Sequence, residues 1–301
     1  MNLFICICTS NRPFLLKRTL YSLSKLYKPS HVNVHVVIID NNIYSNNRSI
    51  IKKFNNKSFF KLIYKYELKK GIVNSRNKFI DYILSVKKKI DFVGFVDDDC
   101  EIDKKWLINH MRSFKDYGHI SISTGPQLVN KANSLEKIFY NLLNKNLYKK
   151  FKTTSWAATN NVIIRFEILK KTKIKFDLFL NNIGGSDQLF FAKLNKRNYK
   201  ILWNANAKVY ENLSLRKLNF NWFFKRSLRY GFSGAYMYNS LHGNLVGFLL
   251  SGSKIIYLLL YSILLIPLFF KKFYFFKSLM NLIKILGIIR YLIGIKIKNY
   301  N

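Results

Sequence analysis

The stretch FVDDDCEID, residues 95–103, places five acidic residues within seven positions at the end of an apolar run, FVGFV (92–96). The whole chain has 15 Asp and Glu residues against 51 Lys and Arg, so this concentration of like charge requires compensation. In open α/β sheets, ligands bind outside the carboxyl ends of the strands. The stretch therefore predicts a buried strand that carries an acidic site at its carboxyl end.

Strand-length apolar runs alternate with helical patterns over the first 125 residues. Strands are predicted at LFICIC (3–8), VNVHVVIID (32–40), FFKLIYKYE (59–67) and FVGFV (92–96). Helices are predicted after Pro13, from GIVNSRN (71–77) and around Leu107, Met111 and Phe114. This order predicts a doubly wound α/β half with a mainly parallel sheet.

Polar segments follow three of these predicted strands. They are TSNR (9–12), DNN (40–42) and DDD (97–99). Because the carboxyl ends of parallel strands lie at one edge of a sheet, we expect these groups to converge there.

Beyond residue 126 the pattern is less regular. A helix is predicted around residues 135–151, a strand at WAATNNVIIR (156–165), and two more at YKILWN (199–204) and AKVYE (207–211). Gly184 and Gly185 precede Ser186, a residue type that caps helices. Asp187 is thus expected in the first turn of a helix, where the macrodipole favours a carboxylate.

The formal net charge of +36 favours an anionic partner, such as nucleic acid, a membrane surface or a phosphorylated substrate. The residue bias of an AT-rich genome would explain the same excess, because Lys outnumbers Arg 40 to 11 and Asn and Ile are abundant. The total charge alone does not distinguish an anionic partner from genome bias.

The last 90 residues combine basic and apolar character. Residues 212–301 contain thirteen Lys or Arg and no Asp or Glu, and residues 255–270 carry no charge. A bilayer span needs about 20 apolar residues, and the basic apolar stretch 273–295 is typical of a helix in the membrane interface. Flanking positive charge favours membrane attachment over the alternative, a buried pair of core helices. The flanking lysines are Lys271, Lys272, Lys296 and Lys298.

The chain has three cysteines, which are Cys6, Cys8 and Cys100. An odd number without CxxC spacing indicates neither a disulfide framework nor a zinc site. Cys6 and Cys8 share a face of their strand and are interpreted as core residues in a reduced, cytosolic protein. The start MNLFICICTSNRP has no basic region before its apolar run and reaches Pro13 at once, so it is not expected to be a signal peptide.

The acidic stretch predicts a metal site. On an extended segment Asp97 and Asp99 point to the same side, where two hard oxygen ligands suit Mg²⁺ or Mn²⁺. Such ions bind through one or two carboxylates plus phosphate oxygens, so the inferred ligand is a diphosphate. The alternative is a solvated acidic turn that caps a helix beginning near Asp103.

Several other residues are candidates for ligand contacts, each with a structural alternative. Arg12 and Arg76 suit phosphate or nucleotide oxyanions but could equally be surface cations. Asp40 could accept hydrogen bonds from a base or ribose, or could cap the following segment. The run RSLRYG (226–231) could hold phosphate or lipid head groups, or form an ordinary basic helix face.

Five motifs in order resemble glycosyltransferase family 2, over about residues 1–235. They are CTSNRP (8–13), DNN (40–42), KGIVNSRN (70–77), FVDDDCEIDKKWL (95–107) and GGSDQLFF (184–191). The resemblance implies a GT-A fold, which is a Rossmann-like, doubly wound mixed sheet. It also implies a nucleotide-sugar donor, a divalent cation, and single displacement with inversion at the anomeric carbon.

Residue roles follow from the same resemblance. Nucleotide contacts are implied for Thr9, Arg12, Asp40, Arg76, Asp97 and Asp98. Asp99 would be the principal ligand of Mn²⁺ or Mg²⁺ with Asp97 beside it, and Asp187 would be the general base. Candidates for diphosphate or acceptor contacts are Trp156, Arg226 and Arg229.

Two departures from the family pattern stand out. Ser186 occupies the position where many relatives have Glu before the catalytic Asp. No QxxRW motif is evident, which argues against a processive polysaccharide synthase.

The expectation is a catalytic domain over residues 1–240 and a membrane-associating helical tail over residues 241–301. The enzyme would face the cytosol and transfer one sugar, with UDP favoured by resemblance, to a lipid-linked or cell-surface glycan. Nucleic acid is not expected as a partner.

Three alternative functions compete with this expectation. A basic nucleic-acid-binding protein leaves the acidic stretch unexplained, and a non-catalytic sensor would bind the donor without turnover. A phosphatase with an Asp nucleophile fits poorly, because Glu101 stands at the position where Thr is expected.

Overall fold

The computed structural model describes residues 1–45, 47–55, 59–129, 134–143, 151–211 and 219–295. Residues 144–150 of the helix predicted around residues 135–151 lie outside this part of the chain, as do Lys296 and Lys298. The chain divides into two units. Unit 1 takes residues 1–130, 146–181 and 186–212, and unit 2 takes residues 131–145, 182–185 and 213–301.

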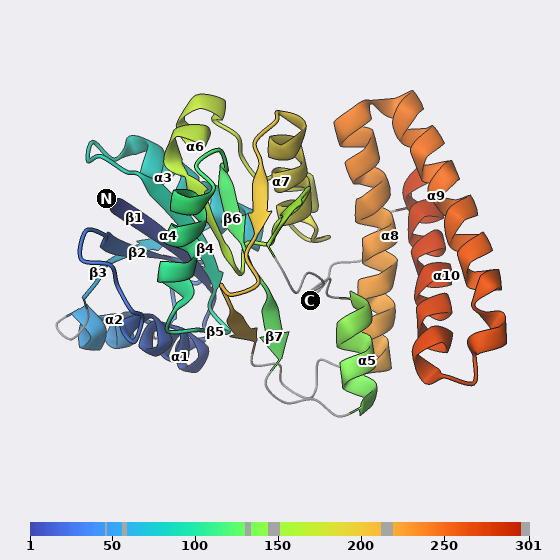
Figure 1. Ribbon diagram of the computed structural model, residues 1–301, viewed down its shortest axis with the longest axis horizontal. Coiled ribbons are helices and arrows are strands. Elements are labelled where there is room, and N and C mark those ends of the chain that lie inside the picture. The colour runs from blue at the N-terminus through green and yellow to red at the C-terminus, as the bar shows by residue number, and fades with distance from the viewer. Residues whose placement is uncertain (46, 56–58, 130–133, 144–150, 212–218, 296–301) are drawn as a thin grey trace. The chain divides into compact units, whose positions relative to one another are not determined.

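Unit 1 is built on an eight-stranded mixed sheet (Figure 1). Its strand order is β3-β2-β1-β4-β9-β6-β10-β8. The strands are β1 (Asn2–Thr9), β2 (Asn33–Asp40), β3 (Lys61–Tyr66), β4 (Phe92–Asp97), β6 (Ile122–Thr124), β8 (Lys152–Thr154), β9 (Val162–Arg165) and β10 (Ile201–Trp203). The first four strands pair in parallel, whereas β9 runs antiparallel to both β4 and β6. The predicted doubly wound mixed sheet is thus confirmed.

Helices cover both faces of this sheet. One face packs against α1 (Pro13–Ser24), α2 (Asn47–Asn55) and α4 (Trp106–Asp116). The other face packs against α3 (Ile72–Ser85), α6 (Phe166–Thr172) and α7 (Ser186–Lys196), with a 3₁₀ turn at Leu178–Leu180 before α7. Pro13 starts α1, where its missing N–H costs no intrahelical hydrogen bond.

The central strand β1 is buried on both sides, because successive side chains of a strand point to opposite faces. Leu3 and Ile5 pack under α1, and Phe4 and Cys6 pack under α3. Cys8 lies against the same cluster as Cys6, as predicted from their spacing. Each fully buried Leu or Ile contributes about 1.5–3 kcal/mol to folding, so this layered core holds the strand ends in place.

A small second sheet lies after the acidic stretch. It contains β5 (Cys100–Ile102), β7 (Gln127–Val129) and β11 (Val209–Glu211), with β11 in the middle. Strand β5 follows Asp99 at once and runs antiparallel to β11. The acidic stretch therefore turns from one sheet into another.

Unit 2 is helical and contains α5 (Ser134–Leu143), α8 (Phe220–His242), α9 (Asn244–Leu264), a 3₁₀ turn at Ile266–Leu268 and α10 (Lys272–Leu292). Helices α8, α9 and α10 pack on one another (Figure 1). Gly231 of α8 permits a close approach to α10, since a Cβ there would lie 1.9 Å from the main-chain oxygen of Lys284. The predicted domain boundary at residue 240 falls inside α8.

Candidate functional site

Three strand ends meet at one edge of the large sheet, which we call the carboxyl edge. Thr9 of β1 is in register with Asp40 of β2, and Cys8 is in register with Asp97 of β4. These residues end or nearly end their strands. The predicted convergence of polar groups is confirmed for these strands.

The carboxylate of Asp98 contacts other side chains of the protein. Its carboxylate is almost fully buried, accepts a hydrogen bond from Thr9 Oγ1 at 2.7 Å, and is paired with Arg12 Nη1 at 3.2 Å. Burial raises its pKa, and the Arg12 charge and the Thr9 hydrogen bond oppose the rise. Thr19 Oγ1 lies 2.8 Å from the main-chain oxygens of both Asp98 and Cys100. These contacts hold the acidic turn against β1 and α1, and a contact of Asp98 with a nucleotide stays a prediction.

Asp97 faces the site with a side chain that is 38% exposed. Burial of the remainder raises the pKa of its carboxyl to about 7, Arg76 opposes the rise, and the neighbouring Asp99, Asp98 and Asp187 add to it. Three further carboxylates therefore act on Asp97, and together with burial they outweigh the effect of Arg76 on its pKa.

The assumption that residues 97–99 are extended is wrong, because the chain turns at 98 and 99 before β5 begins. The reason is tertiary: Thr19 and Arg12 hold this turn from α1 and the loop before it. Arg12 Nη1 lies 3.8 Å from Asp99 Oδ2.

The residues of the acidic turn suit a divalent cation. Asp97 and Asp99 provide carboxylate oxygens, and Asp97 carries a raised pKa that a nearby positive ion would lower. No group of three or more metal-ligating side chains is found among the described residues. Two protein carboxylates with phosphate oxygens and water completing the coordination are typical of Mg²⁺ and Mn²⁺ sites, so the donor set fits.

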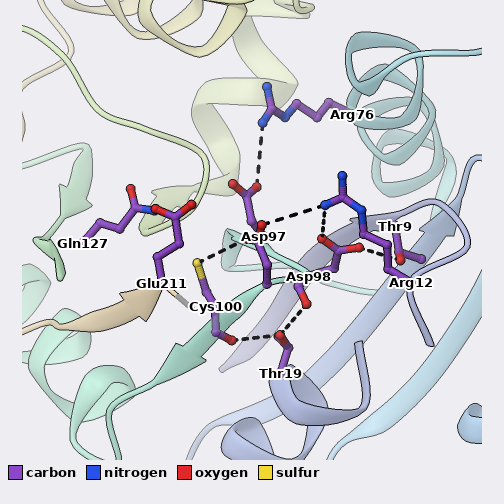
Figure 2. Close-up of polar contacts among 10 residues, drawn as sticks. Thr9, Arg12, Thr19, Arg76, Asp97, Asp98, Cys100, Gln127 and Glu211 are labelled. Atoms are coloured by element: carbon purple, nitrogen blue, oxygen red, sulfur yellow. Dashed lines mark hydrogen bonds and ion pairs between the residues drawn. The ribbon is translucent and has the colours of Figure 1, made fainter. Parts of the chain in front are cut away.

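Arg76 contacts residues of two other elements, and Figure 2 shows it beside Asp97. It is 8% exposed and comes from α3; its Nη2 lies 3.8 Å from Asp97 Oδ1, and its Nη1 donates to Ser186 Oγ at 3.1 Å. Ser186 is the first residue of α7, so Asp187 lies in its first turn, as predicted. Ser186, which stands where many relatives have Glu, thus accepts a hydrogen bond from Arg76. The other terminal nitrogen of Arg76 lies beside Asp97.

Asp40 is fully buried at the end of β2. Its Oδ2 accepts from Ser45, from Asn47 Nδ2 at 2.8 Å and from Tyr64 at 2.6 Å, and its Oδ1 accepts from the main-chain N–H of Asn42 at 3.0 Å. These bonds shape the loop after β2 in the way the capping alternative proposed. A direct nucleotide contact stays a prediction.

Glu211 is a site residue that sequence reasoning missed. It ends β11 directly opposite Cys100, the residue after Asp99, and accepts a hydrogen bond from Gln127 Nε2. Figure 2 shows Gln127 beside Glu211. Gln127 Oε1 in turn accepts from Asn160. This relay orients a further carboxylate beside the acidic turn. One feature of the sequence could have pointed to Glu211, because it is the last acidic residue of the chain and ends an apolar run.

Three candidates remain. Trp156 of unit 1 packs on the buried Trp203 of β10, with ring centroids 6.3 Å apart. Arg226 and Arg229 lie on α8 of unit 2. Their predicted contacts with a diphosphate or an acceptor stay predictions.

Comparison with known proteins gives a family and a fold. The family described as Glycosyl transferase family 2 matches residues 4–173, which is 170 of the 301 residues. The structure is similar to the mannosyltransferase PcManGT from Pyrobaculum calidifontis in complex with GDP-Man and Mn²⁺. The TM-score is 0.64 at 14% identity, over 98% of this chain and 88% of that one.

It is also similar to S. aureus TarS 1–349, with a TM-score of 0.54 at 17% identity over 100% of this chain and 94% of that one. The same TarS fragment in complex with UDP-GlcNAc gives a TM-score of 0.50 at 17% identity, over 79% and 67%. No curated protein matches the sequence. At these identities the structural similarity shows only the fold, which is of the GT-A type. The assignment to a family rests on the family match. The chain belongs to glycosyl transferase family 2 and is a glycosyltransferase.

Proposed function

We propose that this glycosyltransferase transfers a sugar, with inversion, from a nucleotide-diphosphate donor to a hydroxyl of a lipid-linked or cell-surface glycan at the cytoplasmic face of the membrane. The observation that carries the proposal is the charge arrangement at the carboxyl edge. Asp99 and Asp187 both act electrostatically on Asp97, which lies beside the buried guanidinium of Arg76. A divalent cation held at these carboxylates would stabilise their ionised form, and a donor diphosphate would bind to that cation.

The donor class is supported by the similar structures. One holds GDP-Man with Mn²⁺ and another holds UDP-GlcNAc. In this chain Arg76 offers a guanidinium next to Asp97, and a guanidinium binds phosphate oxygens in a bidentate manner. Among nucleotides, UDP is proposed on the family resemblance, with GDP and dTDP as the alternatives for the test below.

The chemistry assigns one proton transfer to Asp187. Its carboxylate accepts the proton of the acceptor hydroxyl while that oxygen forms a bond to the anomeric carbon. The bond from the anomeric carbon to the donor phosphate oxygen breaks, and the nucleoside diphosphate leaves with the electron pair. A bound Mn²⁺ or Mg²⁺ supplies charge neutralisation of the leaving diphosphate. Arg76 adds a fixed positive charge on the same side, beside Asp97.

The membrane part of the proposal rests on α9. This helix has 21 residues, and its most apolar stretch of 18 residues has a mean hydropathy of 1.7 and is 22% buried. By length and composition it could cross a bilayer. Its exposed side chains include Leu245, Phe248, Leu249, Ile256, Leu260, Ile263 and Leu264. An apolar face of this size on the outside of a protein is typical of a membrane contact. Lys254, near the middle of α9, lies over the Tyr257 ring at 4.5 Å and favours an interfacial position over a span.

Nucleotide binding tests the donor site. The full chain, solubilised in detergent at 150 mM salt, is titrated calorimetrically with UDP, GDP and dTDP, with and without Mn²⁺. We expect Mn²⁺-dependent binding of one nucleotide and its loss in Asp99→Asn. The matched control is Asp116→Asn, because Asp116 is an exposed acid at the end of α4, away from the turn. Unchanged Mn²⁺-dependent binding in Asp99→Asn would reject the metal assignment.

Turnover tests Asp187. With the nucleotide sugar whose nucleotide binds, and a membrane lipid extract as acceptor, Asp187→Asn should retain donor binding and lose transfer. Transfer near the wild-type rate in Asp187→Asn would reject Asp187 as the base.

Flotation with phosphatidylcholine–phosphatidylglycerol vesicles tests the membrane contact. Leu260→Lys with Leu264→Lys should reduce flotation, because both side chains are exposed apolar groups on α9. Equal flotation of this variant and the wild type would reject α9 as the attachment helix.

A further inference from the structure

The side chain of Asn181 is bonded to the start of α3. Its Nδ2 donates to the main-chain oxygen of Lys70 at 2.9 Å, and its Oδ1 accepts from the main-chain N–H of Val73 at 3.0 Å. Val73 lies in the first turn of α3, where N–H groups have no partner within the helix. Asn181 therefore caps this helix from 108 residues away in the sequence.

Gly71, at the start of the motif GIVNSRN, leaves room for this amide. A Cβ at residue 71 would lie 2.1 Å from Asn181 Nδ2, and Gly71 has φ +114°, a conformation that other residues adopt only with strain. The main-chain N–H of Gly71 also donates to Asn41 Oδ1 at 2.6 Å. The position requires a glycine because two asparagine side chains meet the backbone there.

A second asparagine bridge lies one turn further along α3. Asn77 Nδ2 donates to the main-chain oxygen of Phe176 at 2.9 Å, and Asn77 Oδ1 accepts from the main-chain N–H of Phe176 at 2.8 Å. The buried Phe176 ring stacks on Phe190 of α7, with 4.1 Å between the ring centroids. We call residues 176–181 the bracing segment, because its two ends bond α3 and its first residue packs on α7.

Arg76 lies on α3 between the two bridges. Its guanidinium carbon is 5.5 Å from the centroid of the Phe176 ring, and its terminal nitrogens reach Asp97 and Ser186. Ser186 begins α7, and Asp187 follows it. The direction of the guanidinium thus depends on the relative position of α3 and α7, and the bracing segment contacts both helices. All of these residues belong to unit 1.

We infer that Asn77 and Asn181 are positioning residues, which hold the bracing segment on α3 and thereby keep Arg76 between Asp97 and the turn that carries Asp187. The inference rests on the proposed function, in which Arg76 contacts the donor diphosphate. Each amide bonds main-chain groups through both its donor and its acceptor, so its geometry is fixed. Neither asparagine is assigned a contact with the donor, so their effect on donor binding must pass through Arg76.

A double-mutant cycle in nucleotide affinity is the first arm of the test. The full chain in detergent is titrated with UDP, GDP and dTDP in the presence of Mn²⁺, as the wild type, Asn181→Ala, Arg76→Gln and the double variant. We expect Asn181→Ala to weaken binding about fivefold and the double variant to bind no more weakly than Arg76→Gln. The reason is that the bracing segment has no guanidinium to position in the Arg76→Gln background. A loss in the double variant equal to the product of the two single losses would overturn the inference.

Asn109→Ala is the matched control. Asn109 Nδ2 on α4 donates to the main-chain oxygen of Asn206 at 2.8 Å, so this variant also loses a bond from an asparagine side chain to the main chain. It should keep the wild-type affinity. If Asn181→Ala lowers the free energy of unfolding but also keeps the wild-type affinity, its role is structural alone and the inference is wrong. Asn77→Ala replaces Asn181→Ala in the cycle if the latter fails to fold, as judged by circular dichroism.

Hydrogen exchange of the nucleotide-free protein is the second arm, and it needs no donor. Asn181→Ala should speed exchange of main-chain amides about fivefold in both α3 and α7, whereas Asn109→Ala should leave both helices unchanged. Faster exchange in α3 alone would show that the bracing segment does not couple the two helices, and would overturn the inference. Coupled exchange in a protein whose wild type binds no nucleotide would contradict the proposed function and support the positioning role.

Discussion

Arg76 and Asp97 face each other at the carboxyl edge, with 3.8 Å between Nη2 and Oδ1. The guanidinium comes from α3 and also donates to Ser186 at the start of α7, so one buried cation connects the acidic turn with the segment of Asp187. Even with Arg76 beside it, Asp97 has a pKa raised to about 7. Burial is the main cause of this rise, so the ionised form of Asp97 is destabilised in the folded protein, and this has measurable consequences.

Asp97 should make the free energy of unfolding of the metal-free protein fall as the pH rises from about 4 to about 7. The folded pKa lies above the ordinary value of 3.8, so the folded state binds more protons than the unfolded state in this window. Asp98, Asp99 and Asp187 add to the repulsion when Asp97 ionises, and Arg76 reduces it. Urea unfolding in EDTA at several pH values measures the decline.

Asp97→Asn should flatten that decline, and Asp116→Asn should leave it unchanged. Added Mn²⁺ should also flatten it in the wild type, because the cation stabilises the ionised carboxylates. A wild-type decline that persists in Asp97→Asn would show that another group causes it.

His110 should produce the opposite dependence in acid. The ring is fully buried between Ser123 and Asn161, and burial lowers its pKa to about 4. The Asn161 amide donates to two main-chain oxygens, so its Oδ1 must accept, which makes His110 a neutral ring protonated at Nε2. Below pH 6.5 the unfolded state binds the proton and the folded state does not, so stability is lost as the pH falls towards 4.

The loss through His110 should reach at most about 3 kcal/mol. His110→Gln, which cannot titrate, should be less stable at pH 7 but should lack this component of the acid dependence. His119→Gln, at an exposed histidine, is the control. An unchanged acid dependence in His110→Gln would contradict the assignment.

Thr9→Val should destabilise the protein by about 1–3 kcal/mol, because it removes the buried hydroxyl that donates to Asp98 at 2.7 Å. The two side chains have nearly the same shape, so the change isolates the hydrogen bond. Thermal or urea unfolding measures it. Thr153→Val, at an exposed position of β8, should change stability by no more than about 0.5 kcal/mol. Equal effects at both positions would contradict a specific role of Thr9.

Gly231→Ala and Gly234→Ala should have opposite effects although both change a glycine of α8. A Cβ at residue 231 would lie 1.9 Å from the main-chain oxygen of Lys284, so α8 and α10 must separate at a cost of about 1–3 kcal/mol. A Cβ at residue 234 meets nothing within 4 Å, so alanine should stabilise by about 0.5–1 kcal/mol. Melting temperatures in detergent compare the two, and a stabilised Gly231→Ala variant would contradict this packing.

Long periodic elements could be predicted from the sequence, whereas short ones could not. Strands β1, β2, β3 and β4 and helices α1, α3 and α4 occur where the pattern predicts them. The strand predicted at 156–165 is limited to Val162–Arg165, because only these four residues pair with β4 and β6. Three-residue strands such as β5 and β7 are too short to show a period, and their partners lie far away in the sequence.

The sequence by itself determined which residue types stand at the strand ends, that acid is concentrated after β4, and that the last part of the chain is basic and apolar. These are properties of neighbouring residues, and periodicity reports them directly. Tertiary structure alone decided what each acid does. Asp98 pairs with Thr9, 89 residues away, and Arg76 bonds Ser186, 110 residues away. Glu211 meets Gln127 across 84 residues. Such partners are brought together by packing of the whole core, which no local pattern encodes.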